Sequence, residues 1–219
     1  SLDGRTVVKI VVRNPSLRWP VPDTVHRAAK SRVGECRRRA KYLLLGLQGT
    51  GGGLLIHLGM SGSLRVCGAD DAIRKHDHVD IVLDNGRCLR FHDPRRFGVF
   101  SWFDDPADEH ELLRDLGPEP LSSDFDGACL YQRSRGRRGA VKNFIMDGRT
   151  VVGVGNIYAS EALFMSGIHP ARAAGRISAA RYEALSRAIK DVLARAIRRG
   201  GTTLRDFLDP ESSPGYFAR

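Results

Sequence analysis

A series of short apolar segments, separated by turn residues, fills the first half of this 219-residue chain. The clearest turn is Asn85-Gly86, which separates segments 78–83 and 88–91 and is typical of a tight β-hairpin. The other segments expected to be strands are 5–13, 39–47, 54–58, 63–67 and 97–103. Several short strands with regular turns predict a β-sandwich or a barrel.

The second half of the chain has helical periodicity instead. Residues 178–199 carry an apolar stripe, with Ser178 at the N-cap and Gly200-Gly201 at the C-cap. Further helices are expected over residues 106–116, over 139–147 and after the glycines of 151–155. The proline-containing connector 117–120 predicts a boundary between a domain of residues 1–117 and a helical domain of residues 118–219. The expected fold class is therefore α+β.

The charge balance favours a polyanionic partner. The chain has 35 Lys and Arg against 25 Asp and Glu, a formal net charge of +10, and an excess of this kind is typical of nucleic-acid-binding proteins. No apolar run is long enough to span a membrane, and the N-terminus has no signal-peptide pattern. The four cysteines form no CxxC pair, which argues against a zinc finger in this stretch and for reduced thiols in the cytoplasm.

A glycine-rich junction at residues 151–161 leads into one of the expected helices, and Phe164 is among the apolar side chains of this helix that are expected to be buried. Gly153 and Gly155 let the backbone approach a partner closely, and Asn156 stands where the helix begins. A helix N-terminus is an anion site, so a phosphate contact is one interpretation. An ordinary turn before a helix is the other.

Two loops between strands carry unusual apolar residues. Met60 lies in the turn 59–62, and Phe97 ends a loop, 93–98, that also contains Arg95 and Arg96. An apolar wedge beside an arginine is what a protein needs to enter a duplex and fill the gap left by an extruded base. The alternative is that Met60 and Phe97 are core residues near loop ends.

Two basic clusters are candidates for phosphate contacts. The run 133–138, followed by Lys142, is either a phosphate-tracking surface or a solvated basic face. Lys41 ends the basic run 37–41, where like charges disfavour its protonated form and could prepare it for acid–base work. Phosphate affinity alone is the other interpretation of Lys41.

The sequence His76-Asp77-His78 invites a metal interpretation, because two imidazoles on a strand would share a face. No third ligand lies nearby in the sequence. A phosphate contact or a hydrogen-bonded structural role is therefore favoured over a metal site.

Together these motifs resemble the formamidopyrimidine-DNA glycosylase (Fpg/Nei) family over essentially the whole chain. The segments that carry the resemblance are 38–44, 57–62, 75–80, 93–98, 151–161, 200–203 and 214–217. The resemblance implies a β-sandwich domain and a helical domain with a helix-two-turn-helix, which bind double-stranded DNA between them. It also implies excision of oxidised purines such as 8-oxoguanine and formamidopyrimidines, followed by strand cleavage through β,δ-elimination. The partner is then DNA that contains an oxidised purine or an abasic site, and the protein is a monomer.

Individual residues match the family's functional positions. Lys41 matches the lysine that assists β-elimination. Met60, Arg95 and Phe97 match the residues that fill the space left by the flipped nucleotide. The other matching DNA-contact positions are His57, His76, Arg137, Lys142 and Asn156. Residues 202–217, with Thr202, Thr203 and Tyr216, match the loop that closes over the extruded base.

Two family features are not among these residues. The family's nucleophile is an N-terminal proline in a Pro-Glu-Leu-Pro-Glu motif, whereas this sequence starts Ser1-Leu-Asp-Gly4. A C-terminal four-cysteine zinc finger is also missing, so no cofactor is expected in this stretch and one zinc ion in the complete protein. We expect the 219 residues to belong to a longer enzyme. The alternative functions are a non-catalytic module that binds damaged DNA and, less favoured, an RNA-binding protein.

Overall fold

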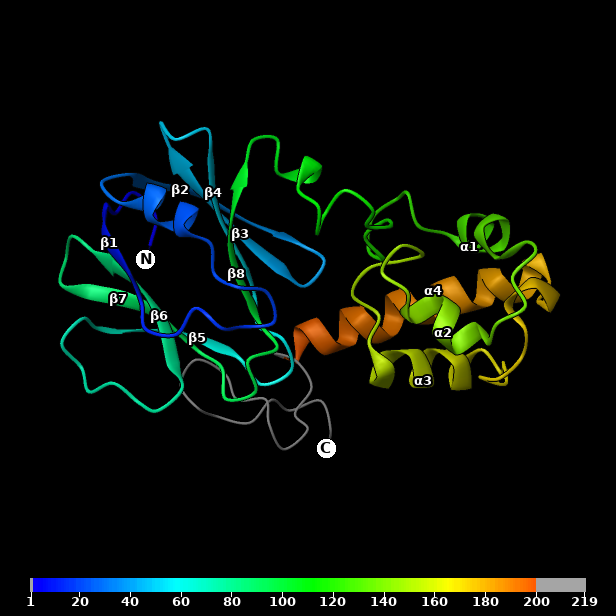
Figure 1. Ribbon diagram of the computed structural model, residues 1–219. Helices are drawn as coiled ribbons and strands as arrows, with labels where there is room; N and C mark the ends of the chain where they lie inside the picture. The colour runs from blue at the N-terminus through cyan, green and yellow to red at the C-terminus, as the bar shows by residue number, and fades with distance from the viewer. Residues whose placement is uncertain (1, 200–219) are drawn as a thin grey trace. The chain divides into compact units, whose positions relative to one another are not determined.

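The computed structural model describes residues 2–199, which form two compact units (Figure 1). The first ends at Arg114 and the second begins at Asp115. We call residues 2–114 the β unit and residues 115–199 the helical unit. No helix in the described part of the chain is long and apolar enough to cross a membrane.

The β unit contains two antiparallel four-stranded sheets, which confirms the predicted β-rich half. The first sheet has, in order, β1 (Val7–Val12), β6 (Asp77–Leu83), β7 (Arg87–His92) and β5 (Ser63–Gly68). The second has β2 (Arg32–Arg39), β3 (Tyr42–Gln48), β4 (Gly52–His57) and β8 (Val99–Asp104). The 3-10 helices η1 (Asp23–Ala28) and η2 (Ala107–Glu109) lie before β2 and after β8.

A single apolar core joins the two sheets. Leu54 and Ile56 from β4 belong to the same buried cluster as Ile81 from β6 and Phe91 from β7, and Val25 of η1 joins them. Burial of such side chains from both sheets is the main force that holds a sandwich together. The expected β-sandwich is therefore confirmed.

The strand registers bring six chain segments to one end of the β unit. In the second sheet Tyr42 pairs with His57, and His57 pairs with Val99. In the first sheet His92 pairs with both Ser63 and Asp77. The connections β4–β5 and β7–β8 both cross from one sheet to the other at this end, so their loops are neighbours.

Two predictions in the β unit are wrong. The predicted strand 39–47 is a hairpin: β2 ends at Arg39, Ala40 takes a positive φ of 55°, and β3 starts at Tyr42. The strand β2 is polar and mostly exposed, so apolar periodicity does not reveal it. The predicted helix 106–116 is only the short η2 followed by turns. Leu113 is fully buried there but has too few apolar partners at helical spacing to fix a helix.

The helical unit contains four α-helices and a 3-10 helix among its described residues. They are α1 (Gly127–Ser134), α2 (Val141–Met146), α3 (Asn156–Met165), η3 (Ala174–Arg176) and α4 (Ala179–Arg198). Leu130, Phe144, Leu163 and Tyr182 bury together and connect the four α-helices in one core.

The helix predictions were right in three places and wrong in two. The helices after residues 139, 155 and 178 are confirmed, although the Ser178 side chain makes no capping hydrogen bond. Helix α1 was missed; its N-cap Asp126 accepts a hydrogen bond from the Cys129 N–H. Phe164 was predicted to be buried but is 88% exposed, because α3 is apolar on most of its faces and periodicity does not single out the buried one. Gly200-Gly201 lie outside the described residues.

Candidate nucleic-acid interface

Two loops at one end of the β unit carry the apolar residues that the sequence singled out. We call residues 58–62, between β4 and β5, the Met60 turn, and residues 93–98, between β7 and β8, the Phe97 loop. Met60 is 54% exposed and Phe97 is 44% exposed, so neither belongs to the core. The interpretation of both as core residues is therefore wrong.

The Met60 turn and the Phe97 loop are packed backbone to backbone. Gly59 has a positive φ of 66°, and a Cβ atom there would lie 2.6 Å from the carbonyl carbon of Phe97. Only glycine permits this approach in this conformation. In the loop itself the Arg95 guanidinium lies over the Phe97 ring, 4.8 Å from its centroid. Met60, Arg95 and Phe97 thus form an exposed apolar and cationic tip, which has the composition of a wedge.

Lys41 lies in the turn between β2 and β3, near His57 at the same end of the β unit as the tip. Its ammonium has no hydrogen-bond or ion-pair partner among residues 2–199. Partial desolvation by the surrounding protein lowers the pKa of Lys41 from its usual value. The direction agrees with the sequence-based hypothesis, but the main cause is desolvation rather than like charges.

His57 ends β4 near Lys41, and its surroundings favour the neutral form of the ring. Its Nδ1 accepts a hydrogen bond of 2.9 Å from the Gly59 N–H, which leaves the proton on Nε2. Burial lowers the pKa of His57, and the charges of Lys41 and Arg18 lower it further, against a smaller opposing effect of Asp93. The ring also packs against Tyr42, with centroids 4.9 Å apart. A neutral imidazole with Nε2–H can donate a hydrogen bond to a phosphate oxygen.

The two histidines of the 76–78 segment have different surroundings. His78 is buried, and its Nε2 donates a 2.8 Å hydrogen bond to the carbonyl oxygen of Asp93, which is a structural role. His76 is half-buried just before β6, in edge contact with the rings of His78 and His92. Residues 2–199 contain no group of three or more His, Cys, Asp or Glu side chains that could hold a metal ion. The zinc that the resemblance implies therefore has no ligand set in this part of the chain.

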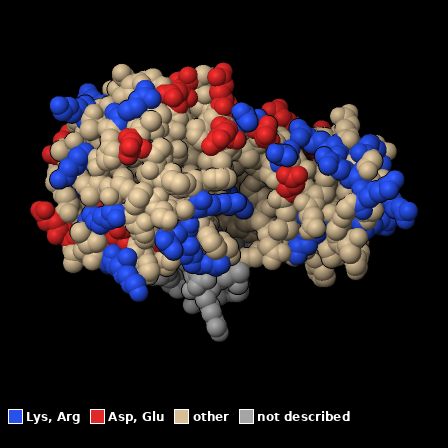
Figure 2. Space-filling view, viewed as in Figure 1, with Lys and Arg blue, Asp and Glu red and all other residues tan. Residues whose placement is uncertain are grey.

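The helical unit carries the remaining predicted contact residues. Arg137 is exposed in the loop after α1, Lys142 lies in the first turn of α2, and Asn156 is the exposed first residue of α3. Within the described chain, the side chains of Arg137 and Lys142 have no ion-pair partner. Figure 2 shows Lys and Arg side chains gathered where α1 and the start of α4 lie.

Not every cation of the 133–138 run is available to a ligand. Arg135 donates to the carbonyl oxygens of Tyr131, Gly175 and Ile177, and its guanidinium stacks on the Tyr131 ring at 3.9 Å. Arg133 donates to the Arg149 carbonyl oxygen. The run is therefore partly structural, and Arg137 and Arg138 are its two cations whose side chains make no such contact in residues 2–199.

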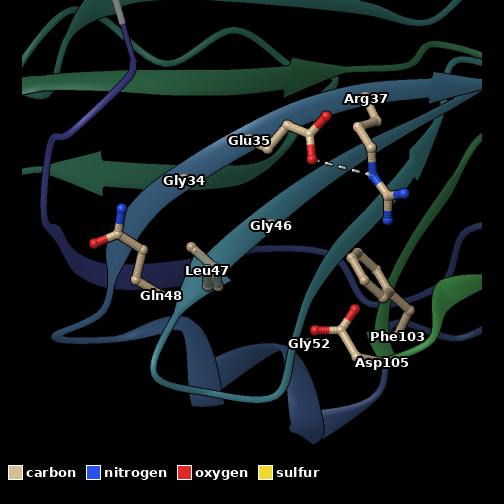
Figure 3. A pocket seen from close by; sticks show the side chains of 9 residues that line it. All are labelled: Gly34, Glu35, Arg37, Gly46, Leu47, Gln48, Gly52, Phe103 and Asp105. Atoms are coloured by element: carbon tan, nitrogen blue, oxygen red, sulfur yellow. Dashed lines mark ion pairs between the residues drawn. The ribbon is translucent and has the colours of Figure 1, made fainter.

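A hollow elsewhere in the β unit contains none of the predicted site residues. Figure 3 shows it against the second sheet, with Glu35 and Arg37 forming an ion pair of 3.7 Å at its edge. Its volume is about 210 Å³, and it is lined by Gly34, Glu35, Arg37, Gly46, Leu47, Gln48, Gly52, Phe103 and Asp105. Most of this lining lies toward the end of the sheet opposite to the Tyr42–His57 pair.

Sequence reasoning missed two residues that connect the Met60 turn to the Phe97 loop. Asp93 and Ser61 hydrogen-bond to each other across the two loops, over 3.3 Å. Ser61 lies in the segment 59–62, which was singled out for Met60, and Asp93 lies in the segment 93–98, which was singled out for Phe97. No spacing in the sequence indicates that the two loops are in contact. The predicted lesion-recognition loop, with Thr202, Thr203 and Tyr216, lies outside the described residues.

Two family models cover most of the chain. Residues 1–100 match the formamidopyrimidine-DNA glycosylase N-terminal domain, and residues 116–208 match the formamidopyrimidine-DNA glycosylase H2TH domain. The chain is 60% identical to a formamidopyrimidine-DNA glycosylase of Alcanivorax borkumensis over 100% of this chain and 80% of the relative. It is 58% identical to the corresponding protein of Syntrophotalea carbinolica over 97% of this chain and 78% of the relative.

Solved structures have the same fold. The MutM (Fpg) protein of Thermus thermophilus superposes with a TM-score of 0.87 at 37% identity, over 99% of this chain and 78% of that one. Lactococcus lactis Fpg, in complex with DNA that contains an abasic site, superposes with a TM-score of 0.87 at 25% identity, over 99% of this chain and 79% of that one. Because both domain models and close relatives match along nearly its whole length, the chain belongs to the formamidopyrimidine-DNA glycosylase family.

Proposed function

We propose that this protein is a bifunctional DNA glycosylase and AP lyase of base-excision repair. It removes oxidised purines, namely 8-oxoguanine and formamidopyrimidines, from double-stranded DNA. The observation that carries the proposal is the exposed tip of Met60, Arg95 and Phe97 on two interlocked loops. The related L. lactis enzyme was solved with DNA that contains Fapy-dG.

The exposed tip offsets part of the free-energy cost of base extrusion. Flipping a nucleotide out of a duplex costs a few kcal/mol. Met60 and Phe97 offset part of this cost by stacking in the gap, and Arg95 places a positive charge beside them. Apolar residues in such an opening also keep the extruded base from returning.

Cationic and neutral donors around the tip hold the DNA backbone. Lys41 offers an unpaired ammonium and His57 offers Nε2–H, both at the same end of the second sheet. His76 lies at the adjacent end of the first sheet. Further phosphates are bound in the helical unit by Arg137, Lys142 and the N-terminus of α3 at Asn156.

The chemistry runs through a Schiff base. An amine attacks C1′ of the damaged nucleotide, the base leaves, and the resulting imine makes the C2′ proton acidic. Loss of that proton expels the 3′ phosphate, and a second elimination expels the 5′ phosphate. Lys41, whose pKa is lowered by desolvation, assists proton transfer in the elimination. The attacking amine that the family resemblance implies, an N-terminal proline, is not among these 219 residues.

The protein acts as a monomer on nucleoid DNA in the bacterial cytoplasm. The zinc ion that the resemblance implies would be held outside residues 2–199, and no step above depends on it.

Borohydride trapping tests this proposal. The natural polypeptide, with whatever residues flank these 219, is incubated with a duplex that contains one 8-oxoguanine, and an undamaged duplex serves as control. We expect a covalent protein–DNA adduct and strand cleavage with the damaged duplex only. Lesion-specific binding without an adduct would instead support a non-catalytic module that recognises damaged DNA.

The 219 residues alone provide a second comparison. We expect no adduct from them, because the proline amine is missing. An adduct from these residues would mean that another amine, such as Lys41, replaces it.

A further inference from the structure

The carboxylate of Asp93 lies at the junction of the two wedge loops. Asp93 is fully buried, although it directly follows β7 and begins an otherwise exposed loop. A buried carboxylate is costly unless hydrogen bonds satisfy it. Its two oxygen atoms reach different loops: Oδ2 accepts a hydrogen bond of 2.8 Å from the Gly98 N–H, and Oδ1 accepts one of 3.3 Å from the Ser61 hydroxyl.

These two partners are the immediate neighbours of the wedge residues. Ser61 follows Met60 in the Met60 turn, and Gly98 follows Phe97 in the Phe97 loop. One carboxylate therefore connects the residue after each wedge side chain. An apolar contact between the Met60 and Phe97 side chains would fix their separation less well than these hydrogen bonds do, because apolar contacts are not directional.

Asp93 is itself fixed to the sandwich by its backbone. Its N–H donates to the His76 carbonyl oxygen over 3.0 Å, and its carbonyl oxygen accepts from His78 Nε2 over 2.8 Å. Asp93 therefore links Ser61 and Gly98, through its side chain, to His78 of β6, through its backbone.

The Phe97 loop needs such an anchor. Arg96 takes a positive φ of 57°, a conformation that is unfavourable for a residue with a side chain. The Arg96 N–H donates to the Asp93 carbonyl oxygen over 3.3 Å, which closes the loop around Asp93. At Gly98, a Cβ atom would lie 3.0 Å from Asp93 Oδ2 and 2.7 Å from the His57 carbonyl oxygen, so the close approach requires glycine.

We propose that Asp93 is a positioning residue that holds Met60 and Phe97 in register, so that both enter the duplex as one wedge. This inference rests on the proposed function. Asp93 touches neither base nor phosphate in this role; it acts through Ser61 and Gly98.

Two substitutions at Asp93 distinguish the effect of its hydrogen bonds from the effect of its negative charge. Asp93→Asn keeps one oxygen to accept from the Gly98 N–H, and its amide can donate to the Ser61 hydroxyl, so both connections survive without the charge. Asp93→Ala removes both. The measured quantity is lesion selectivity, the affinity for a duplex with a tetrahydrofuran abasic analogue divided by that for an undamaged duplex. We expect Asp93→Ala to lower selectivity about tenfold and Asp93→Asn to stay within about twofold of the unmodified protein.

A double-mutant cycle with Phe97→Ala distinguishes positioning from general stability. If Asp93 acts through the wedge, Asp93→Ala causes little further loss of selectivity in a protein that already lacks the Phe97 ring. The matched control is Asp71→Ala, which removes an equivalent bond, from the Gly68 N–H to Asp71 Oδ2, at a surface turn of the same unit. We expect this control to leave selectivity unchanged.

Ser61→Ala keeps the test valid if Asp93→Ala does not fold. It removes only the connection to the Met60 turn and is expected to lower selectivity about threefold, whereas the control Ser101→Ala on β8 leaves it unchanged. Full selectivity in both Asp93→Ala and Ser61→Ala would overturn the inference. Additive losses for Asp93→Ala and Phe97→Ala would also overturn it. Absence of lesion selectivity in the unmodified protein would instead contradict the proposed function.

Discussion

Gly59 and Phe97 are in backbone contact across two loops that belong to different strand connections. A Cβ atom on Gly59 would lie 2.6 Å from the Phe97 carbonyl carbon and 2.7 Å from the Gly98 nitrogen. The φ of Gly59 is also positive, at 66°. The contact sets how closely the Met60 turn and the Phe97 loop can approach each other.

Gly59→Ala is expected to damage both stability and lesion binding. An alanine is strained in the left-handed backbone conformation of this position, and its Cβ atom would push the Phe97 loop away. We therefore expect a loss of about 1–3 kcal/mol in the free energy of unfolding. Gly86→Ala is the matched control, because Gly86 also has a positive φ, of 74°, but an added Cβ would meet no atom within 4 Å. Denaturant unfolding and lesion binding measure the two effects. Equal lesion affinity in the two variants would contradict the importance of the contact.

Phe97→Ala is expected to impair lesion binding while the fold stays intact. The ring is 44% exposed, so its removal should change the free energy of unfolding by less than about 1 kcal/mol. Phe100→Ala, three residues later, removes a ring that is 1% exposed and should cost about 3–5 kcal/mol. Thermal unfolding of both variants checks this. A loss for Phe97→Ala as large as that for Phe100→Ala would place Phe97 in the core.

The stability of the protein should decline as the pH falls below 6.5, in part because of His57. Its pKa is lowered from 6.5 in the folded state, so the unfolded chain binds a proton first. The contribution of neutral His57 is therefore complete above pH 6.5 and is lost as the pH falls toward the lower folded-state value. His57→Asn keeps an acceptor for the Gly59 N–H and should make this decline shallower. Denaturant titrations at several pH values measure it; an unchanged slope would refute the prediction.

Arg137→Ala and Lys142→Ala should each weaken DNA binding without changing its sequence preference. Each removes one phosphate contact, so the slope of log K against log salt concentration should become shallower by about one. Arg135→Ala is the comparison, because Arg135 is already bound to backbone carbonyl oxygens and Tyr131. We expect it to reduce stability by about 1–3 kcal/mol and to affect the salt slope less. Identical salt slopes for Arg137→Ala and the unmodified protein would exclude Arg137 as a phosphate contact.

Acid should destabilise the β unit through Asp80. Burial alone would raise the pKa of this carboxyl, but hydrogen bonds from Arg13 and Arg90 lower it below its ordinary value of 3.8. Its contribution to stability is present above pH 3.8 and is lost as the pH falls through the lower folded-state pKa. Asp80→Asn removes the nearer carboxylate of the fully buried Arg90 and leaves it only that of Asp77, 3.9 Å away, which should cost about 3–5 kcal/mol. The same variant should lose part of the acid dependence, as followed by circular dichroism.

Some elements were predictable because local signals determine them. Asn85-Gly86 set the β6–β7 hairpin, and the glycines before Asn156 set the start of α3. The turn positions of Met60 and Phe97 made exposure one of two interpretations, beside a core role, and the structure confirms exposure. These features depend on a few neighbouring residues, which a sequence displays directly.

Other elements depend on contacts between distant residues. Strand β2 is polar and exists because it pairs with β3. The burial of Asp93 depends on Ser61, 32 residues earlier in the chain. The exposure of Phe164 depends on which face of α3 packs against α4, and an almost uniformly apolar helix does not specify that face. In each case the deciding partner is fixed only by the tertiary structure.

The pairing of His92 with Ser63 has a consequence for the order of folding. We expect the Met60 turn and the Phe97 loop to come together only after β5 has joined β7 and β4 has joined β8, and both pairings close long stretches of chain. Such non-local contacts form late, because the loop entropy must be lost before they are made. A partly folded chain, even one with its hairpins in place, therefore lacks the surface that we propose to enter DNA, and we expect damage recognition to require the completed sandwich.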